Sequence, residues 1–144
     1  MKARLSHTWI RILPFLALLI LSFTTAQAQN RTPETVIVNM VSKGPGVWRF
    51  EPAAVTVQPG DTLRFVQKDT APHNVQFKDT PKGARLDDIR VGPFLLAVGQ
   101  TYDLVIDDRF VPGEYRYVCT PHEMLGMKGS FKVLQVSPTH ATRK

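Results

Sequence analysis

Hydrophobic and polar residues alternate along short stretches of the chain between about residue 35 and residue 136. Side chains of a β-strand point to opposite faces in turn, so this alternation predicts strands with one buried face. The stretch TYDLVID shows the pattern well, because Tyr102, Leu104 and Ile106 fall on the same face. We predict strands at residues 35–41, 54–57, 62–67, 73–77, 101–107, 114–119 and 129–136, with a further apolar position at Phe50.

Proline and glycine separate these predicted strands. The breaks KGPG (43–46), QPGD (58–61) and VPG (111–113) are typical of turns between short strands. No long segment has a sustained helical period, but the irregular stretch 79–100 leaves room for one short helix around residues 84–90. Short strands rich in Val, Tyr and Phe with such turns indicate an all-β domain, a sandwich or a barrel.

The two ends of the chain differ in composition from the rest. Three basic residues precede an apolar run at 12–23, and Ala26-Gln27-Ala28 then gives the small-x-small pattern that signal peptidase accepts. The run is shorter than the roughly 20 residues of a membrane-spanning helix. We therefore predict a cleaved secretory signal peptide at residues 1–28, a single domain at 29–136 and a polar flexible tail at 137–144.

The charge of the chain excludes one class of partner. The predicted signal peptide carries three of the 18 basic residues and none of the 12 acidic ones, so its removal lowers the formal net charge from +6 to +3. The remaining lysines and arginines are scattered among aspartates, whereas nucleic-acid binders concentrate them in a patch or stripe. We expect no nucleic-acid partner and no stable insertion into a membrane.

The chain contains a single cysteine, Cys119, so it has no internal disulfide. A free thiol in an oxidising compartment is reactive unless it is buried or bound to a metal. In the stretch CTPHEMLGM (119–127), His122 follows the cysteine by three positions, and Met124 and Met127 follow it by five and eight. Cys119 therefore has four possible interpretations: a buried hydrophobe, a nucleophile paired with a histidine, a zinc ligand or a copper ligand.

Copper fits these residues better than the other interpretations. A buried hydrophobe leaves His122 unexplained, a nucleophile needs a third residue to orient its histidine, and structural zinc sites use several cysteines. Two imidazoles, one thiolate and a long axial methionine form the blue-copper site. His73, which follows Ala71-Pro72 at the start of a predicted strand, supplies the second imidazole, and a methionine downstream of Cys119 completes the set.

Three blocks of the sequence resemble the small blue copper proteins, the cupredoxins. They are FEPAAVTVQPGDTLRF (50–65), PHNV (72–75) and GEYRYVCTPHEMLGMKGSFKV (113–133). Within that family the chain is most similar to pseudoazurins and next to plastocyanins, over about residues 36–136. The resemblance implies an all-β fold, a Greek-key β-sandwich of the cupredoxin type.

The resemblance also implies the ligands of one type 1 copper ion. His73, Cys119 and His122 match the equatorial ligands of the family, and Met127 matches the axial one. Its eight-residue offset from Cys119 is that of pseudoazurin and plastocyanin, whereas the five-residue offset of Met124 is not. Met124 is expected to pack in the loop at the surface near the copper.

Two structural roles follow from the same resemblance. Asn74 is expected to form a hydrogen bond across to the ligand loop at Thr120, which would hold the two ligand segments together. Tyr115, two residues after Pro112-Gly113, resembles the tyrosine corner of Greek-key folds.

The implied function is that of a soluble electron shuttle and not of an enzyme. Such a protein cycles between Cu(I) and Cu(II) and passes single electrons between periplasmic redox partners. The partners would be transient, such as a nitrite or nitrous oxide reductase, a cytochrome or an oxidase, and we expect a monomer. The alternative is a periplasmic copper-binding carrier or storage protein, which would share the ligands without transferring electrons.

The docking surface of such a shuttle would surround His122. Pro121, Met124 and Leu125 would give it an apolar centre, and redox encounters bury little area. A basic rim could steer acidic partners towards it. The candidates for this rim are Lys43, Lys78, Lys82 and Lys128.

Overall fold

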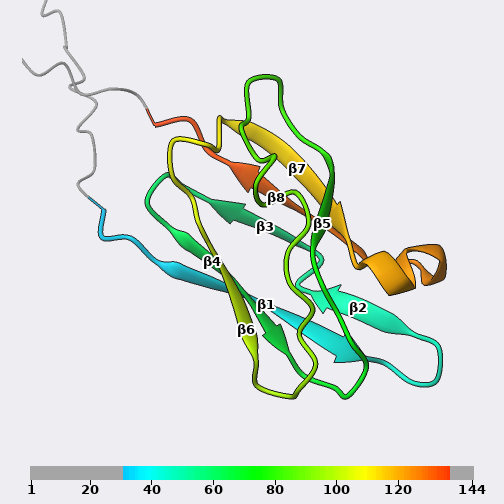
Figure 1. The fold of residues 1–144 in the computed structure, drawn as a ribbon. Helices are drawn as coiled ribbons and strands as arrows, with labels where there is room; N and C mark the ends of the chain where they lie inside the picture. Colours follow the sequence, from blue (N-terminus) through cyan, green and yellow to red (C-terminus); the bar gives the residue numbers. More distant parts are fainter. Residues whose placement is uncertain (1–30, 137–144) are drawn as a thin grey trace, which may run out of the picture.

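The computed structural model describes residues 31–136, which form eight β-strands and one short 3-10 helix, η1 (Figure 1). The predicted signal peptide and the predicted tail lie outside the described residues. In chain order the elements are β1 (Thr35–Ser42), β2 (Trp48–Glu51), β3 (Ala54–Val57), β4 (Thr62–Gln67), β5 (Gln76–Asp79), β6 (Thr101–Val105), β7 (Gly113–Val118), η1 (Thr120–Leu125) and β8 (Lys128–Val133).

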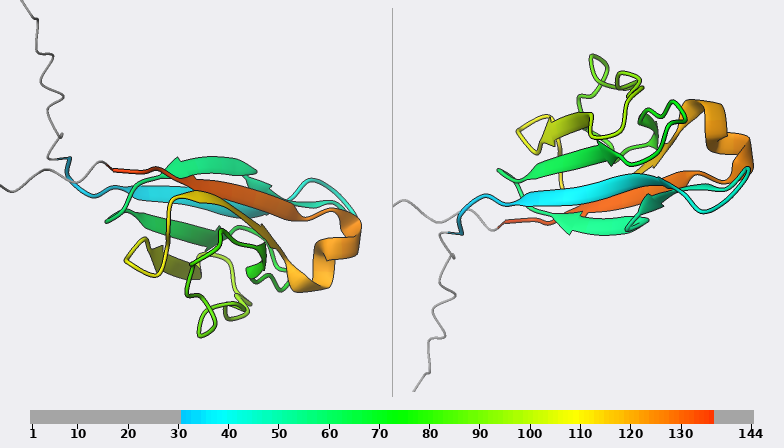
Figure 2. Two further views of the ribbon diagram at one scale, coloured as in Figure 1. Left: turned by 90° about the horizontal axis from the view of Figure 1, so that it is seen from above. Right: turned by 90° about the horizontal axis from the view of Figure 1, so that it is seen from below.

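The strands form two four-stranded sheets, ordered β2-β1-β4-β6 and β3-β8-β7-β5. Each sheet contains one parallel pair, β1 with β4 and β3 with β8, because the chain crosses from one sheet to the other between them. Figure 2 shows the sheets as two layers, with η1 at one end of the sandwich and the ends of the described chain at the other. The prediction of an all-β sandwich is confirmed.

Alternation along the strands places apolar side chains between the two sheets. In β4, Leu63, Phe65 and Gln67 are buried, whereas Arg64 points outwards and pairs with Asp103 of β6. The sequence alternates because each sheet of the two-layer fold buries one face and exposes the other.

Aromatic rings fill the core next to the end of β7. The ring centroid of Tyr117 lies 4.8 Å from that of Phe50 and 5.2 Å from that of Phe65, so it connects both sheets. Tyr115 stacks on Phe131 at 4.8 Å. Each such pair contributes about 0.5–1.5 kcal/mol beyond its buried area. The strand that leads into Cys119 is therefore held firmly.

The strand predicted at residues 73–77 is wrong in its position. The structure begins β5 at Gln76, and His73 instead forms an isolated bridge with Leu95. The N–H groups of His73 and Leu95 donate to each other's carbonyl oxygens at 3.2 and 2.7 Å. A single pair of hydrogen bonds to a distant loop fixes the backbone of His73, and the sequence pattern of a strand cannot reveal that partner.

The short helix expected around residues 84–90 is also wrong, because this stretch forms turns. The N–H of Arg85 donates to the carbonyl of Arg109 in a neighbouring loop, at 3.0 Å, and Leu86 is buried as an apolar anchor. Tertiary contacts thus replace the hydrogen bonds of a helix. Among residues 31–136, no helix is long and apolar enough to cross a membrane.

The tyrosine corner is present. The hydroxyl of Tyr115 donates to the carbonyl of Val111 at 2.7 Å, four residues earlier in the chain. This bond fixes the turn that starts β7 and confirms the structural role expected for Tyr115.

Candidate metal centre

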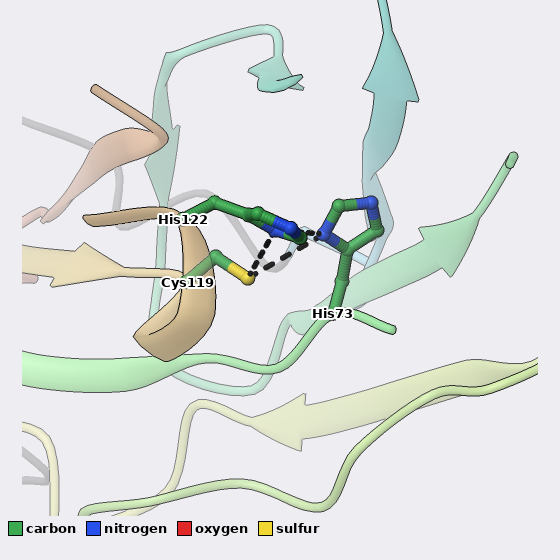
Figure 3. Close-up of side chains that lie close together, drawn as sticks. All are labelled: His73, Cys119 and His122. Atoms are coloured by element: carbon green, nitrogen blue, oxygen red, sulfur yellow. Dashed lines mark hydrogen bonds between the residues drawn. The ribbon is translucent and has the colours of Figure 1, made fainter. Parts of the chain in front are cut away.

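Three metal-ligating side chains meet at the end of the sandwich that carries η1. The Nδ1 atoms of His73 and His122 each lie 3.4 Å from Sγ of Cys119, and the two nitrogens are 3.0 Å apart. Figure 3 shows the three side chains pointing towards one another, Cys119 and His122 from the ligand loop and His73 from a separate segment. The structure therefore brings together three of the four residues that the sequence singled out as copper ligands.

The ligand loop is shaped by its own backbone hydrogen bonds. Cys119 directly follows β7, and its carbonyl accepts a hydrogen bond from the N–H of His122 at 3.0 Å. Gly126 adopts a left-handed φ of 81°, which turns the chain back at the end of η1. Met127 is fully buried, and its carbonyl accepts a hydrogen bond from the N–H of Cys119 at 3.1 Å. The loop thus returns the fourth predicted ligand to the side of the cysteine.

The cluster is shielded from water. Cys119 and His73 are fully buried, and His122 is 8% exposed. Burial raises the pKa of the Cys119 thiol, although hydrogen bonds from the backbone amides of Asn74 and His122 oppose this shift. Burial also lowers the pKa of His122, as does the nearby His73. A neutral imidazole has the lone pair that a metal requires.

The donor set fits a metal ion of the soft or borderline kind. A triangle with sides of 3.4, 3.4 and 3.0 Å has its corners about 1.9 Å from its centre. This value is close to the roughly 2.0–2.3 Å of metal–nitrogen and metal–sulfur bonds. One thiolate and two imidazoles in a trigonal set are the donors of a blue-copper site.

Comparison with known proteins decides between the metals. A family model described as "Copper binding proteins, plastocyanin/azurin family" matches residues 37–134. The chain belongs to this family. Its cofactor is therefore copper, and the buried cluster of two histidines and one cysteine, with Met127 beside it, is typical of a type 1 copper site.

Two relatives of known sequence are plastocyanins. The chain is 36% identical over 90 residues to the plastocyanin of Scenedesmus fuscus, and the match covers 61% of this chain and 89% of that protein. It is 34% identical over 84 residues to the plastocyanin of Prochlorothrix hollandica, with 58% of this chain and 62% of that protein covered. The chain thus spans less than two thirds of the second relative.

Solved structures of cupredoxins have the same fold. A pseudoazurin from Methylobacterium extorquens AM1 is 34% identical, with a TM-score of 0.50, over 69% of this chain and 74% of that one. A mutant plastocyanin of fern is 26% identical, with a TM-score of 0.53, over 69% of this chain and 100% of that one. The predicted cupredoxin fold is confirmed.

The hydrogen bond predicted between the two ligand segments of this cupredoxin is also present. The side-chain oxygen of Asn74 accepts a hydrogen bond from the backbone N–H of Thr120 at 2.8 Å. It joins the residue after His73 to the residue after Cys119, and Asn74 is itself buried. The two segments are therefore locked together before any metal binds.

Sequence reasoning missed two residues that contact the ligand histidines. The carboxylate of Asp69 accepts a hydrogen bond from Nε2 of His73, with both oxygens at 3.1–3.2 Å. The indole of Trp48 stacks on the ring of His122, with centroids 4.1 Å apart and an interplanar angle of 24°. A four-residue offset brings side chains together in a helix, but Asp69 and His73 lie in a turn, so their contact had no signal in the sequence. Trp48 gave none either, because it comes from a strand of the other sheet.

The two methionines of the loop lie in opposite environments. Met127 is fully buried, whereas the side chain of Met124 is 95% exposed. Met124 therefore lies at the surface, as expected, but it is too exposed to pack against the loop. Leu125, next to it, is half exposed, so the cupredoxin has apolar surface beside the ligand loop.

Two of the four candidate rim lysines are engaged in ion pairs. Nζ of Lys78 lies 2.8 Å from Glu123 of the ligand loop, and Nζ of Lys43 lies 2.7 Å from Glu51. Within residues 31–136, Lys128 forms no ion pair, and it lies beside Val118 at the site. Lys82 is wrong as a rim residue, because its neighbours Pro81 and Gly83 lie against Gly113 and Val111, at the end of β7 away from Cys119. The positive charge beside the site is thus partly neutralised by carboxylates.

Proposed function

We propose that this cupredoxin is a soluble one-electron shuttle and not an enzyme. His73, Cys119 and His122 would hold the copper ion, and Met127 would be the fourth ligand. When bound, copper supplies reversible one-electron exchange between Cu(I) and Cu(II), for which thiolate, thioether and imidazole are suitable ligands.

The observation that carries this proposal is the prearranged, buried triangle of donor atoms. Its sides are 3.0–3.4 Å, and its corners come from segments 46 residues apart. A closely packed scaffold resists rearrangement, so these side chains keep one geometry while an electron arrives or leaves. A site closed by four protein ligands leaves no position for a substrate.

The exposed edge of His122 gives the shortest route for electrons to the surface. This histidine is 8% exposed, whereas the other two clustered residues are fully buried. Pro121, Met124 and Leu125 are exposed beside it and would form the apolar centre of a docking surface. Small apolar surfaces of this kind suit brief redox encounters.

The setting that we propose is the periplasm, reached through the signal peptide at residues 1–28. The partners would be redox proteins that bind transiently, such as a nitrite or nitrous oxide reductase, a cytochrome or an oxidase, and the shuttle would be a monomer. Lys128, which lies in β8 beside Val118 and forms no ion pair among residues 31–136, would provide the part of the basic rim that attracts acidic partners. Electron-transfer rates with such partners should then fall as salt increases.

The experiment is a titration of the protein lacking residues 1–28 with Cu(II), followed by visible absorption. We expect an intense thiolate-to-copper charge-transfer band that saturates at one equivalent and is bleached by ascorbate. Cys119→Ser should abolish the band, because it removes the thiolate. Met124→Leu is the matched control for Met127→Leu: the first should leave the band unchanged, and the second should shift it.

A colourless product would contradict the shuttle and favour the copper carrier or storage protein. Release of copper separates these functions further. A carrier must give up its metal to an acceptor, but the donors here are almost completely buried. Transfer of copper to a chelator should therefore be much slower than reduction by ascorbate, and rapid transfer would support the carrier.

A further inference from the structure

Asp69 lies directly behind His73, on the side away from the metal cluster. Nε2 of His73 is 3.1–3.2 Å from both oxygens of the Asp69 carboxylate, while Nδ1 of the same ring faces Sγ of Cys119. The Asp69 side chain is 15% exposed and His73 is fully buried. The imidazole thus bridges a carboxylate and the donor cluster.

The chemistry of the carboxylate decides which nitrogen of His73 carries the proton. An ionised carboxylate is an acceptor only, so Nε2 of His73 must donate. In the neutral ring Nδ1 then has its lone pair free, and this lone pair points at the cluster. The partner of the second ring nitrogen generally sets which nitrogen of a histidine binds a metal.

Asp69 is itself held in place by the turn in which it lies. Its Oδ1 atom accepts a hydrogen bond from the N–H of Ala71 at 2.8 Å. The side-chain amide of Gln67 donates to the carbonyls of Ala71 and Leu95, at 2.5 and 3.1 Å. The turn between β4 and His73 is therefore fixed from both sides, and the carboxylate cannot easily swing away from the ring.

The negative charge of Asp69 is not neutralised by a basic side chain. Within residues 31–136, its carboxylate contacts the His73 ring, and no lysine or arginine forms an ion pair with it. A carboxylate at this distance from the cluster stabilises additional positive charge there. It therefore favours the more highly charged Cu(II) over Cu(I).

We propose that Asp69 is a positioning residue, which fixes the tautomer and orientation of His73 and lowers the reduction potential of the copper site. This inference rests on the proposed function only in taking His73 as a ligand. The fixed tautomer is a property of the metal-free protein and can be tested without copper.

The test compares Asp69→Asn and Asp69→Ala with Asp87→Asn. The asparagine variant keeps the size and one acceptor oxygen but removes the charge, and the alanine variant removes both. Asp87 is the matched control, because its side chain is 98% exposed and its recorded partner is Arg90. The same charge is lost there without a contact to a ligand histidine.

The first measurement is nitrogen NMR of the histidine rings in the metal-free protein. We expect His73 to be protonated at Nε2 alone in the wild type and in Asp87→Asn, and to become a mixture of tautomers in Asp69→Ala. A wild-type His73 protonated at Nδ1, or an unchanged tautomer in Asp69→Ala, would overturn the positioning role even if copper never binds.

The second measurement is the affinity for Cu(II) and Cu(I) together with the reduction potential. Loss of such a partner typically lowers metal affinity about 10–100-fold. We expect Asp69→Asn to weaken Cu(II) about tenfold more than Cu(I), which for one electron equals a rise in potential of about 59 mV. If the reduction potential of Asp69→Asn equals that of the wild type and of Asp87→Asn, the electrostatic role is overturned. This comparison does not need Asp69→Ala, so it holds even if that variant fails to fold.

Discussion

The clearest case of a single residue that shapes the copper site from outside the ligand loop is Trp48. It comes from β2, in the sheet opposite β7, and its half-buried indole covers one face of the His122 ring. The same indole makes an edge contact with His73, at 6.5 Å between centroids. Trp48 therefore confines both imidazoles from the side of the second sheet.

Replacing Trp48 should show how much the stacking stabilises the fold. We expect Trp48→Leu to unfold more easily than Trp48→Phe by about 0.5–1.5 kcal/mol, because phenylalanine can still stack on His122 and leucine cannot. Denaturant unfolding of the metal-free protein measures the difference. Equal stability of the two variants would mean that the indole contributes buried area only.

At the scale of the element, the ligand loop depends on η1 and on the glycine that ends it. Gly126 has a φ of 81°, and its N–H donates to the carbonyl of Glu123 at 3.0 Å. A guanidinium nitrogen of Arg49 also donates to the carbonyl of Leu125, at 3.4 Å, from β2. The loop is thus closed by its own hydrogen bonds and tied to the other sheet.

Substitution of Gly126 tests this loop with a matched pair of variants. We expect Gly126→Ala to lower the free energy of unfolding by about 1–2 kcal/mol, because a Cβ atom disfavours the left-handed conformation. Gly126→Asn should lower the free energy of unfolding by less, since asparagine tolerates that conformation better. Chemical denaturation provides the measurement, and a loss in the asparagine variant as large as that in the alanine variant would argue against a conformational cause.

The elements themselves could be predicted where the local pattern decides them. Strands β1, β3 and β4 alternate between buried and exposed residues, as a sheet with one buried face requires, so their positions follow from the sequence. Residues 84–90 and the segment at His73 could not be placed, because their backbone groups pair with distant loops at Arg109 and Leu95. Local periodicity contains no information on such partners.

At the scale of the whole molecule, Asp61 joins the turn before β4 to the chain that enters β1. Its carboxylate accepts hydrogen bonds from the N–H groups of Glu34 and Gln58, both at 2.9 Å, and from Arg31. Burial acts to raise the pKa of Asp61, but these hydrogen bonds outweigh it, so the net pKa lies below its usual value.

The fold should therefore lose stability in acid through Asp61. The depressed pKa means that the stabilisation is present above the unfolded-state pKa of about 3.9 and is lost as the pH falls through the lower folded-state value. At pH 7 we expect Asp61→Asn to cost about 1.5–3 kcal/mol, the range for hydrogen bonds to charged groups. Denaturant melts from pH 7 to pH 2 should show this difference shrinking as the pH falls.

Asp103→Asn serves as the control for this acid effect. Asp103 is partly exposed and pairs with Arg64, which also lowers the pKa of its carboxylate. Because exposed ion pairs are screened by water, Asp103→Asn should lower the free energy of unfolding less than Asp61→Asn does. A constant difference between wild type and Asp61→Asn across the whole pH range would contradict the role of the ionised carboxylate.

The fold class and the candidate copper ligands could be predicted from local sequence patterns. Strand alternation needs only neighbouring residues, and the spacing of Cys119, His122 and Met127 is local to one loop. The hydrogen bond between Asn74 and Thr120 and the tyrosine corner at Tyr115 could also be expected, from the resemblance to cupredoxins.

The side chains that surround those ligands depend on how the chain folds in three dimensions. The stacking of Trp48 on His122 depends on how the two sheets pack, and the bridge between His73 and Leu95 depends on the path of a loop. The contact of Asp69 with His73 needed the shape of the turn between them. The physical reason is the same in each case: orientation in a packed core is set by partners that are distant in sequence.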